Sequence, residues 1–313
     1  MPSFCESPLP IFVVHWNRPA ECLKTIGLFQ QQGTPVSIRV VDNGSRPDCL
    51  KELRNGLPAS VELMELAENK GWGGGLNVCL RRWLTEKGSD YCIVSAHDSI
   101  PKANCLALLV AAMEHDKSLG MVCPQYEAAE VLKFRPIRGI TTVAAVPRPV
   151  GQVTAVEMPH ATILAFRKQC LAAIGLFDER YFAYGDEVEI GLRARKNGWT
   201  IGMVWGAVVI NPGTWTSSPV VGYLSARSSL LMAADYGGMV RALIRAALMF
   251  VNSLRLLFVP AARNSMSSPR ARLMAIRDFL MRRFGPIPAS LIPKPSVTAS
   301  GNPADEKRNI SAR

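Results

Sequence analysis

The sequence lacks the features that mark a secreted, disulfide-bonded or zinc-binding protein. Its eight cysteines include no C-x-x-C spacing and no flanking histidine pair, so we expect neither a zinc site nor a disulfide framework. The opening MPSFCESPLP has no basic start followed by a long apolar run, which a secretory signal would need. The expected location is therefore the cytoplasm.

The sequence also lacks any helix-turn-helix, zinc finger or aromatic RNA-binding signature, although its formal net charge is +11. We therefore expect no nucleic-acid partner. Most of the excess charge lies between Arg241 and Arg283, a stretch with nine arginines and one acid, Asp278. This concentration favours an anionic membrane surface as the partner, which for a cytoplasmic protein is the inner face of the plasma membrane.

The first half of the arginine-rich stretch has the pattern of a helix with a narrow basic stripe. At about 100° per residue, Arg241, Arg245, Asn252 and Arg255 fall within about 80° of one another, with apolar residues around the remainder. The arginines interrupt the apolar run too often for a transmembrane span. Two interpretations stay open: an amphipathic helix lying in the headgroup plane, or a core helix covered on three sides.

Apolar runs alternate with helical patterns through the first 125 residues, which predicts an α/β fold. We expect a Rossmann-like, mostly parallel sheet flanked by helices, with a C-terminal amphipathic helical extension. The expected strands are 11–15, 37–41, 61–66, 91–95, 120–123, 162–166 and 200–210. The expected helices start at Pro19 and Pro47 and span 75–87, 101–116, 168–174 and 186–197, with 125–149 as a long insertion. We expect three regions: an α/β domain at 1–220, a basic helical region at 221–285 and a disordered tail at 286–313.

Four polar groups follow the predicted strands. In a parallel sheet, ligands bind beyond the carboxyl ends of the strands, so these groups should meet at one edge. Each alone is an ordinary turn, but together they suit a nucleotide base, a ribose and a diphosphate. They are Asn17-Arg18, Asp42-Asn43-Gly44-Ser45, Glu68-Asn69-Lys70-Gly71 and His97-Asp98-Ser99.

The glycine-rich run from Gly71 to Asn77 does not match the dinucleotide-binding fingerprint. That fingerprint needs G-x-G-x-x-G after the first strand, whereas here position 76 is Leu and the run follows the third strand. Hydride transfer is therefore disfavoured. A glycine-rich turn opening a helix still allows its backbone N–H groups to approach an anion, and Asn77 could reach the same ligand.

A second acidic cluster lies at the start of the helix expected at 186–197. Asp186, Glu187 and Glu189 are more acids than a helix cap needs, and they follow two tyrosines and a phenylalanine. A carboxylate beside such an apolar wall could have a raised pKa and take a proton from a sugar hydroxyl. Asp186 and Glu187 are the predicted catalytic residues, with the choice between them open.

Together these motifs resemble family 2 glycosyltransferases of the GT-A fold, especially the rhamnosyltransferases and galactofuranosyltransferases that build bacterial surface glycans. The resemblance runs from about Ile11 to Gly213, and weakly through 223–227 and 277–285. The matching segments are VVHWNRP, VVDNGS, ENKGWGGGLN, the Asp98 loop and GLFDERYFAYGDEVEIGLRARKNGW.

The resemblance implies an inverting transfer from a UDP- or dTDP-sugar to a lipid-linked or polysaccharide acceptor. Asp42 would hold the base, Asp98 would hold Mg²⁺ or Mn²⁺ on the diphosphate, and Glu187 would be the general base. The nucleotide-sugar-binding residues implied by the resemblance and the strand-end pattern are Asn17, Arg18, Asp42, Asn43, Asn69, Gly71, Asn77 and Asp98.

Three positions depart from the family pattern. Ala96 replaces the first metal ligand, Asn211 stands where a histidine is usual, and His160 replaces a small residue near the acceptor. These changes leave open an inactive scaffold that binds glycan or nucleotide at the membrane. A sugar-1-phosphate nucleotidyltransferase is a weaker alternative, because no glycine-rich loop follows the first strand.

Overall fold

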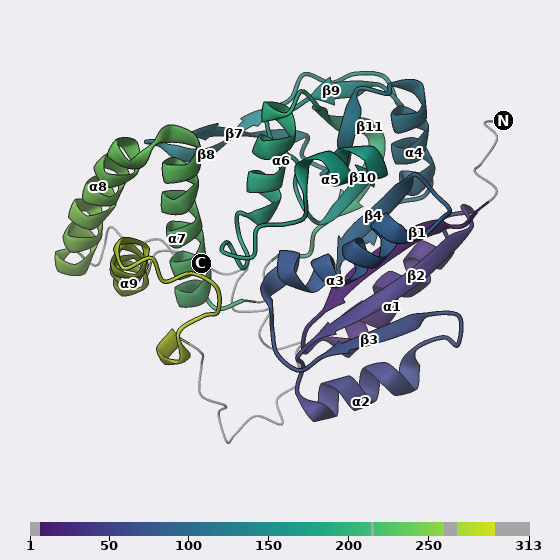
Figure 1. Ribbon diagram of the computed structural model, residues 1–313, viewed down its shortest axis with the longest axis horizontal. Helices are drawn as coiled ribbons and strands as arrows, with labels where there is room; N and C mark the ends of the chain where they lie inside the picture. The colour runs from purple at the N-terminus through teal and green to yellow at the C-terminus, as the bar shows by residue number, and fades with distance from the viewer. Residues whose placement is uncertain (1–6, 214–215, 260–267, 292–313) are drawn as a thin grey trace.

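A computed structural model describes residues 7–213, 216–259 and 268–291 (Figure 1). Its first half is four parallel strands joined by three helices, in the sheet order β3-β2-β1-β4. The strands are β1 (Leu9–His15), β2 (Val36–Asn43), β3 (Glu62–Leu66) and β4 (Tyr91–Ala96). The helices are α1 (Pro19–Gln30), α2 (Pro47–Gly56) and α3 (Gly71–Thr85).

The second half extends the same sheet with both strand directions. Strand β10 lies between β4 and β6 and runs antiparallel to both. Strand β6 then pairs in parallel with β11. Two short strands, β5 and β9, run antiparallel to β11. The α/β class and the helix-flanked, largely parallel sheet are confirmed. These strands are β5 (Ile100–Pro101), β6 (Leu119–Gln125), β9 (Val153–Ala155), β10 (Ile163–Arg167) and β11 (Thr200–Ile210).

Helices cover both faces of this sheet, so successive strand residues are buried alternately on either side. In β1, Ile11 and Val13 belong to one hydrophobic cluster, whereas Phe12 and Val14 belong to the other. Burial on both faces explains the continuous apolar runs in the sequence. The remaining helices of this region are α4 (Cys105–His115), α5 (Lys168–Ile174) and α6 (Asp186–Lys196).

Three expected boundaries differ from the structure. Helix α4 begins at Cys105 and not at Pro101, because Ile100–Pro101 pairs with β11 as a strand. Helix α3 begins at Gly71 and not at Gly75, so the glycine run lies inside the helix. The segment expected as an insertion contains a hairpin, β7 (Glu130–Arg135) and β8 (Gly139–Ala144).

The predicted C-terminal helical extension is present as three helices that pack together at one end of the molecule (Figure 1). The boundary expected at residue 220 falls in the first turn of α7, and the division into regions stays a prediction. A short 3-10 turn, η2, lies at Ala289–Leu291, and residues 292–313 of the predicted tail lie outside the described residues. The three helices are α7 (Ser218–Gly237), α8 (Met239–Phe258) and α9 (Pro269–Leu280).

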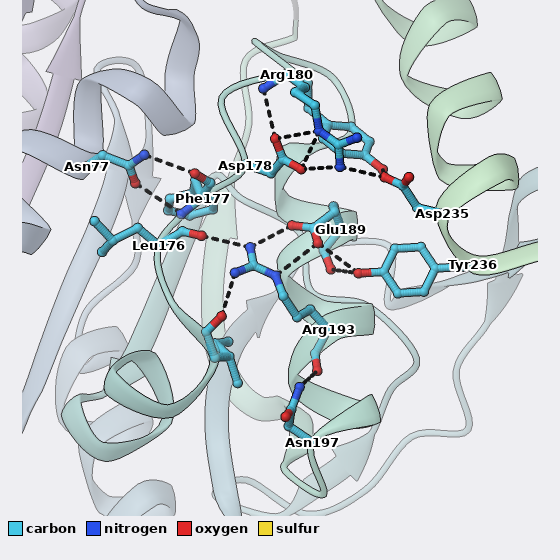
Figure 2. A network of polar contacts seen from close by, with 12 residues as sticks. Asn77, Leu176, Phe177, Asp178, Arg180, Glu189, Arg193, Asn197, Asp235 and Tyr236 are labelled. Atoms are coloured by element: carbon cyan, nitrogen blue, oxygen red, sulfur yellow. Dashed lines mark hydrogen bonds and ion pairs between the residues drawn. The ribbon is translucent and has the colours of Figure 1, made fainter.

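Asn77 joins the first half of the fold to the second. Its buried amide donates hydrogen bonds to the Phe177 carbonyl and to Glu179 Oε1, both at 3.0 Å. Its carbonyl oxygen accepts one from Phe177 N, also at 3.0 Å (Figure 2). One side chain of α3 therefore fixes the backbone of a segment 100 residues away.

We predict that Asn77→Leu lowers the free energy of unfolding by about 2 to 4 kcal/mol, because it leaves the buried N–H and C=O of Phe177 without partners. Asn197→Ala is the matched control. That side chain is exposed and bonds only the Arg193 carbonyl, so we expect a change within about 0.5 kcal/mol. Urea denaturation measures both variants, and equal losses would contradict the role given to Asn77.

Candidate active site

The predicted polar groups collect at one edge of the sheet. Strands β1, β2, β4, β6 and β11 share one direction, so the residues that follow each of them lie at the same edge. The α6 N-terminus also lies there, because Gly73 N, in the first turn after β3, donates to Asp186 Oδ2 at 2.9 Å. Residues from five strand ends and one helix terminus therefore surround one site.

Asp42 is buried and paired with His15, a residue that the motif analysis did not single out. His15 Nδ1 donates to Asp42 Oδ1 at 2.8 Å, while His15 Nε2 accepts from Arg18 N at 3.0 Å. Asp42 Oδ2 accepts from Ser45 N at 3.1 Å. Burial alone would raise the pKa of Asp42, but the hydrogen bonds from His15 and Ser45 outweigh it, and the pKa lies below its ordinary value. The site therefore holds an ionised carboxylate at the end of β2.

Asn17 connects the loops that follow β1 and β2. Its backbone is left-handed at φ 57°, its N–H donates to Ser45 Oγ, and its Oδ1 accepts from Arg46 N at 2.8 Å. Arg18, on the neighbouring turn, lies 3.8 Å from Glu21 as a half-exposed ion pair. Asn17 therefore shapes this part of the site through its loop contacts.

Asn43 and Asn69 connect the loops that follow β2 and β3. Asn43 Nδ2 donates to Asn69 Oδ1 at 3.1 Å and to the Gly71 carbonyl at 2.8 Å, and its Oδ1 accepts from Lys70 N. Asn69 Oδ1 also accepts from Gly71 N at 2.8 Å. The predicted nucleotide-side residues thus lie together and fix one another.

The first turn of α3 is not open to an anion, which corrects the expectation for the glycine-rich run. Trp72 N donates to the Phe182 carbonyl at 2.7 Å and Gly73 N to Asp186, so both amides already have acceptors. Gly71 permits this contact because its φ is +79° and an added Cβ would lie 2.1 Å from the Phe182 oxygen. Asn77 lies in the second turn and contacts Phe177, so we assign it to positioning.

The segment before the acids has a strained backbone. Phe182 and Tyr184 have φ values of 66° and 61°, which bulky residues seldom adopt. Such conformations cost about 1 to 3 kcal/mol each and persist where surrounding contacts enforce them. Here the enforcing contact is the bond from Trp72 to the Phe182 carbonyl, and strain of this kind is typical of functional sites.

The two predicted catalytic acids differ in environment. Asp186 is buried and bonded to Gly73, and its pKa is raised well above its ordinary value, first by burial and then by the charge of Glu187. Glu187 is only partly buried and accepts from Gly185 N at 3.1 Å. Asp186 therefore connects the first turn of α3 to α6, and Glu187 is the more exposed of the two acids.

A polar cluster that the sequence did not reveal lies near Glu187. Tyr126 OH and Thr162 Oγ1 are 2.8 Å apart, and Asn211 Nδ2 donates to the same Thr162 oxygen at 3.0 Å. Burial, and in smaller part the charge of Glu187, raise the pKa of Tyr126 to about 12. Tyr126, Thr162 and Asn211 thus form one connected set of hydroxyl and amide groups at this edge of the sheet. The sequence marks Asn211 as a departure from the family pattern, whereas the only signal for Tyr126 and Thr162 is their position next to strands.

Comparison with known proteins agrees with this arrangement. A family model for glycosyl transferase family 2 matches residues 11–167. The chain belongs to this family. Galactofuranosyltransferase GlfT1 of Mycobacterium tuberculosis is 30% identical over 217 residues, which cover 66% of this chain and 70% of that protein.

Solved glycosyltransferases share the fold. The mannosyltransferase PcManGT of Pyrobaculum calidifontis, in complex with GDP-Man and Mn²⁺, superposes with a TM-score of 0.57 at 16% identity over 88% of each chain. GalNAc-T7 with UDP, GalNAc and Mn²⁺ gives a TM-score of 0.58 at 14% identity, over 74% of this chain and 48% of that one. The GT-A fold expected from the sequence is confirmed.

The position expected to bind a metal in this family 2 chain carries one carboxylate. Asp98 is half-buried directly after β4, beside His97. His97 Nδ1 donates to the Val14 carbonyl, and burial lowers the pKa of His97, opposed in part by the charge of Asp98. Within the described ranges, no group of three or more His, Cys, Asp or Glu side chains could hold a metal ion.

His160 lies beside the polar cluster, with one ring nitrogen bonded and one not. Its Nε2 donates to the Pro124 carbonyl at 2.6 Å, and its ring stacks on Tyr126 with centroids 3.9 Å apart. Its Nδ1 is buried without a hydrogen-bond partner in the described chain. The residue lines a cavity of about 240 Å³ next to the hairpin. Burial lowers the pKa of His160 from 6.5 to about 4.

We predict that His160 makes the protein less stable in acid. The folded state favours neutral His160. Its contribution to the free energy of unfolding is therefore complete above pH 6.5 and is lost as the pH falls from 6.5 towards 4. Between pH 7 and pH 5 the free energy of unfolding should fall by about 2 kcal/mol more in the wild type than in His160→Gln. Urea denaturation at both pH values tests this, with the exposed His115→Gln as control. Identical pH profiles for wild type and His160→Gln would contradict it.

Proposed function

We propose that this family 2 protein is an inverting glycosyltransferase in which Glu187 is the general base. Glu187 takes the proton of an acceptor hydroxyl, the hydroxyl oxygen bonds to the anomeric carbon of the donor sugar, and the nucleoside diphosphate leaves with the electrons of the broken bond. The observation that carries the proposal is the placement of Glu187. It is a partly exposed carboxylate at the α6 N-terminus, close to Tyr126 and at the same sheet edge as Asp42.

The donor is a nucleotide sugar, with UDP- and dTDP-sugars as the leading candidates. Asp42 supplies an ionised acceptor for base N–H groups, and its fixed geometry comes from His15 and Ser45. Asp98 fits a hard cation, because one carboxylate oxygen and the donor's phosphate oxygens are ligands that Mg²⁺ and Mn²⁺ accept. Such an ion would neutralise charge on the leaving diphosphate.

The acceptor in this proposal is a lipid-linked sugar or a growing polysaccharide of the cell envelope, reached from the cytoplasmic face of the plasma membrane. The galactofuranosyltransferase relative supports transfer of a sugar, and the basic C-terminal helices support a membrane location for the acceptor. Hexosyl or rhamnosyl transfer is the reaction we expect. An inactive scaffold is the alternative, motivated by Ala96 and Asn211.

We predict that Glu187→Gln lowers the transfer rate at least about 100-fold while leaving nucleotide binding nearly unchanged, because it removes the base and keeps the shape. Asp186→Asn is the matched control. It preserves an acceptor for Gly73 N and should keep most of the activity. Release of nucleoside diphosphate is measured with a panel of nucleotide sugars and an extract that contains acceptors. Full activity in Glu187→Gln would sink the assignment, and no activity in the wild type would favour the scaffold.

We further predict that one class of nucleotide sugar raises the melting temperature by about 4 °C at 100 times its dissociation constant, more with Mn²⁺ than without. UDP-, dTDP- and GDP-sugars are compared by thermal shift. Asp42→Asn should abolish the shift, whereas Asp48→Asn, an exposed carboxylate on α2, should keep it. If the shift did not depend on Asp42, the nucleotide base would have to bind elsewhere in the protein. Equal shifts with and without Mn²⁺ would remove the metal from the proposal.

A further inference from the structure

Helix α8 presents a large apolar surface to solvent. Besides Met239 at its first position, which is 51% exposed, seven of its large apolar side chains are between 43% and 82% exposed. Soluble monomers rarely expose apolar residues contiguously over such a length. The helix is also the outermost element at its end of the molecule (Figure 1). We call this set the outer face of α8: Val240, Leu243, Ile244, Leu248, Phe250, Val251 and Phe258.

The opposite side of α8 is narrow and contacts the rest of the protein. Ala242, Ala246, Ser253 and Leu256 are buried, and they lie within about 80° on the helix. Helices α7 and α9 pack against α8. Among residues 7–213, 216–259 and 268–291, the rest of the fold therefore covers one stripe of α8, which argues against a core helix covered on three sides.

The arginines of α8 do not form the outer face. Arg245 donates to the Ile137 carbonyl at 2.6 Å and to Ser229 Oγ, so it connects α8 to the hairpin and to α7. Arg241 and Arg255 are exposed. At about 100° per residue, Arg241 lies beside the outer face and Arg255 lies among its residues. Of the arginines in the basic stripe, Arg245 therefore makes contacts within the protein, whereas Arg241 and Arg255 are exposed to solvent.

Further exposed arginines lie on α9 and on the residues that follow it. Arg270, Arg277, Arg282 and Arg283 are exposed. The one acid in this part of the sequence, Asp278, is buried and bonded to Arg277 and to Tyr223 OH. An apolar face together with exposed arginines, of which Arg277 alone is paired with Asp278, fits the boundary between the acyl chains and the phosphates of an anionic bilayer.

We propose that α8 lies in the plane of an anionic membrane. Its outer face lies among the acyl chains, and its exposed Arg241 and Arg255 lie at the lipid phosphates. No helix among the described residues is long and apolar enough to cross a membrane. A second copy of the chain is a poorer occupant, because a two-fold interface on this face would bring the same arginines together.

This docking surface is connected to the segment that carries the acids. Arg180 donates to Asp235 of α7 at 2.9 Å, and Tyr236 OH donates to Glu189 at 2.8 Å (Figure 2). Helix α7 therefore joins α8 to the Glu187 end of α6. Presentation of a lipid-linked acceptor to Glu187 is the one step here that rests on the proposed function.

The test is co-sedimentation of the full chain with phosphatidylcholine vesicles and with vesicles that also contain phosphatidylglycerol. We expect the wild type to bind the anionic vesicles, and Leu248→Asp/Val251→Asp to lower the partition coefficient at least tenfold. Arg241→Ser/Arg255→Ser should lower binding to anionic vesicles only. Val146→Asp, at an equally exposed valine away from α8, should bind as the wild type does.

Wild type that binds neither vesicle, or a Leu248→Asp/Val251→Asp variant that binds normally, would overturn the proposal. The proposal would also be overturned if light scattering showed that the wild type is a dimer and this variant a monomer, while vesicles bound neither protein. Nucleotide-sugar thermal shifts are measured on the same samples and should be equal in all variants. Failure of membrane binding is thereby separated from failure of the proposed transfer.

Discussion

The first turn of α3 determines where the segment that carries Asp186 and Glu187 lies. Trp72 N and Gly73 N donate to the Phe182 carbonyl and to Asp186, so a helix of the first half is capped by the second half. Gly73 allows the close approach, since an added Cβ would lie 2.6 Å from the Phe177 side chain. Burial and the charge of Glu187 raise the pKa of Asp186, so the folded protein favours its protonated form, which still accepts a hydrogen bond from Gly73 N. The cap places the next residue, Glu187, at the sheet edge.

This constraint also explains why these amides of the glycine run already have acceptors within the chain. The pattern of a glycine-rich helix start is the same whether the N–H groups bind a ligand or a distant part of the chain. Only the fold shows which acceptor is present, and here it comes from Asp186, 113 residues away. Asn77 changes role for the same reason, because its partners are at Phe177 and Glu179.

Local patterns predicted most of the sheet but not its full topology. Strands such as β1 and β4 are buried on both faces, so their apolar runs stand out in the sequence. The antiparallel direction of β10 leaves no such mark, because direction depends on the connection and not on composition. The strand-end rule located Asp42 and Asp98. It passed over Tyr126, Thr162 and Asn211, whose importance comes from their contacts with one another.

The arginines of α8 also show that a sequence pattern does not reveal which face of a helix the rest of the protein covers. A helical projection places Arg241, Arg245 and Arg255 on one stripe, but it does not say which stripe the protein covers. Small residues at Ala242 and Ala246 allow α8 to pack closely, and that packing turns the large apolar residues outward. Because α7 contacts both α8 and the segment before Glu187, a membrane that fixes α8 would also fix the direction in which the catalytic acid faces. A soluble acceptor gains nothing from that orientation, whereas a lipid-linked acceptor, confined to the same plane, would meet Glu187 from one side only.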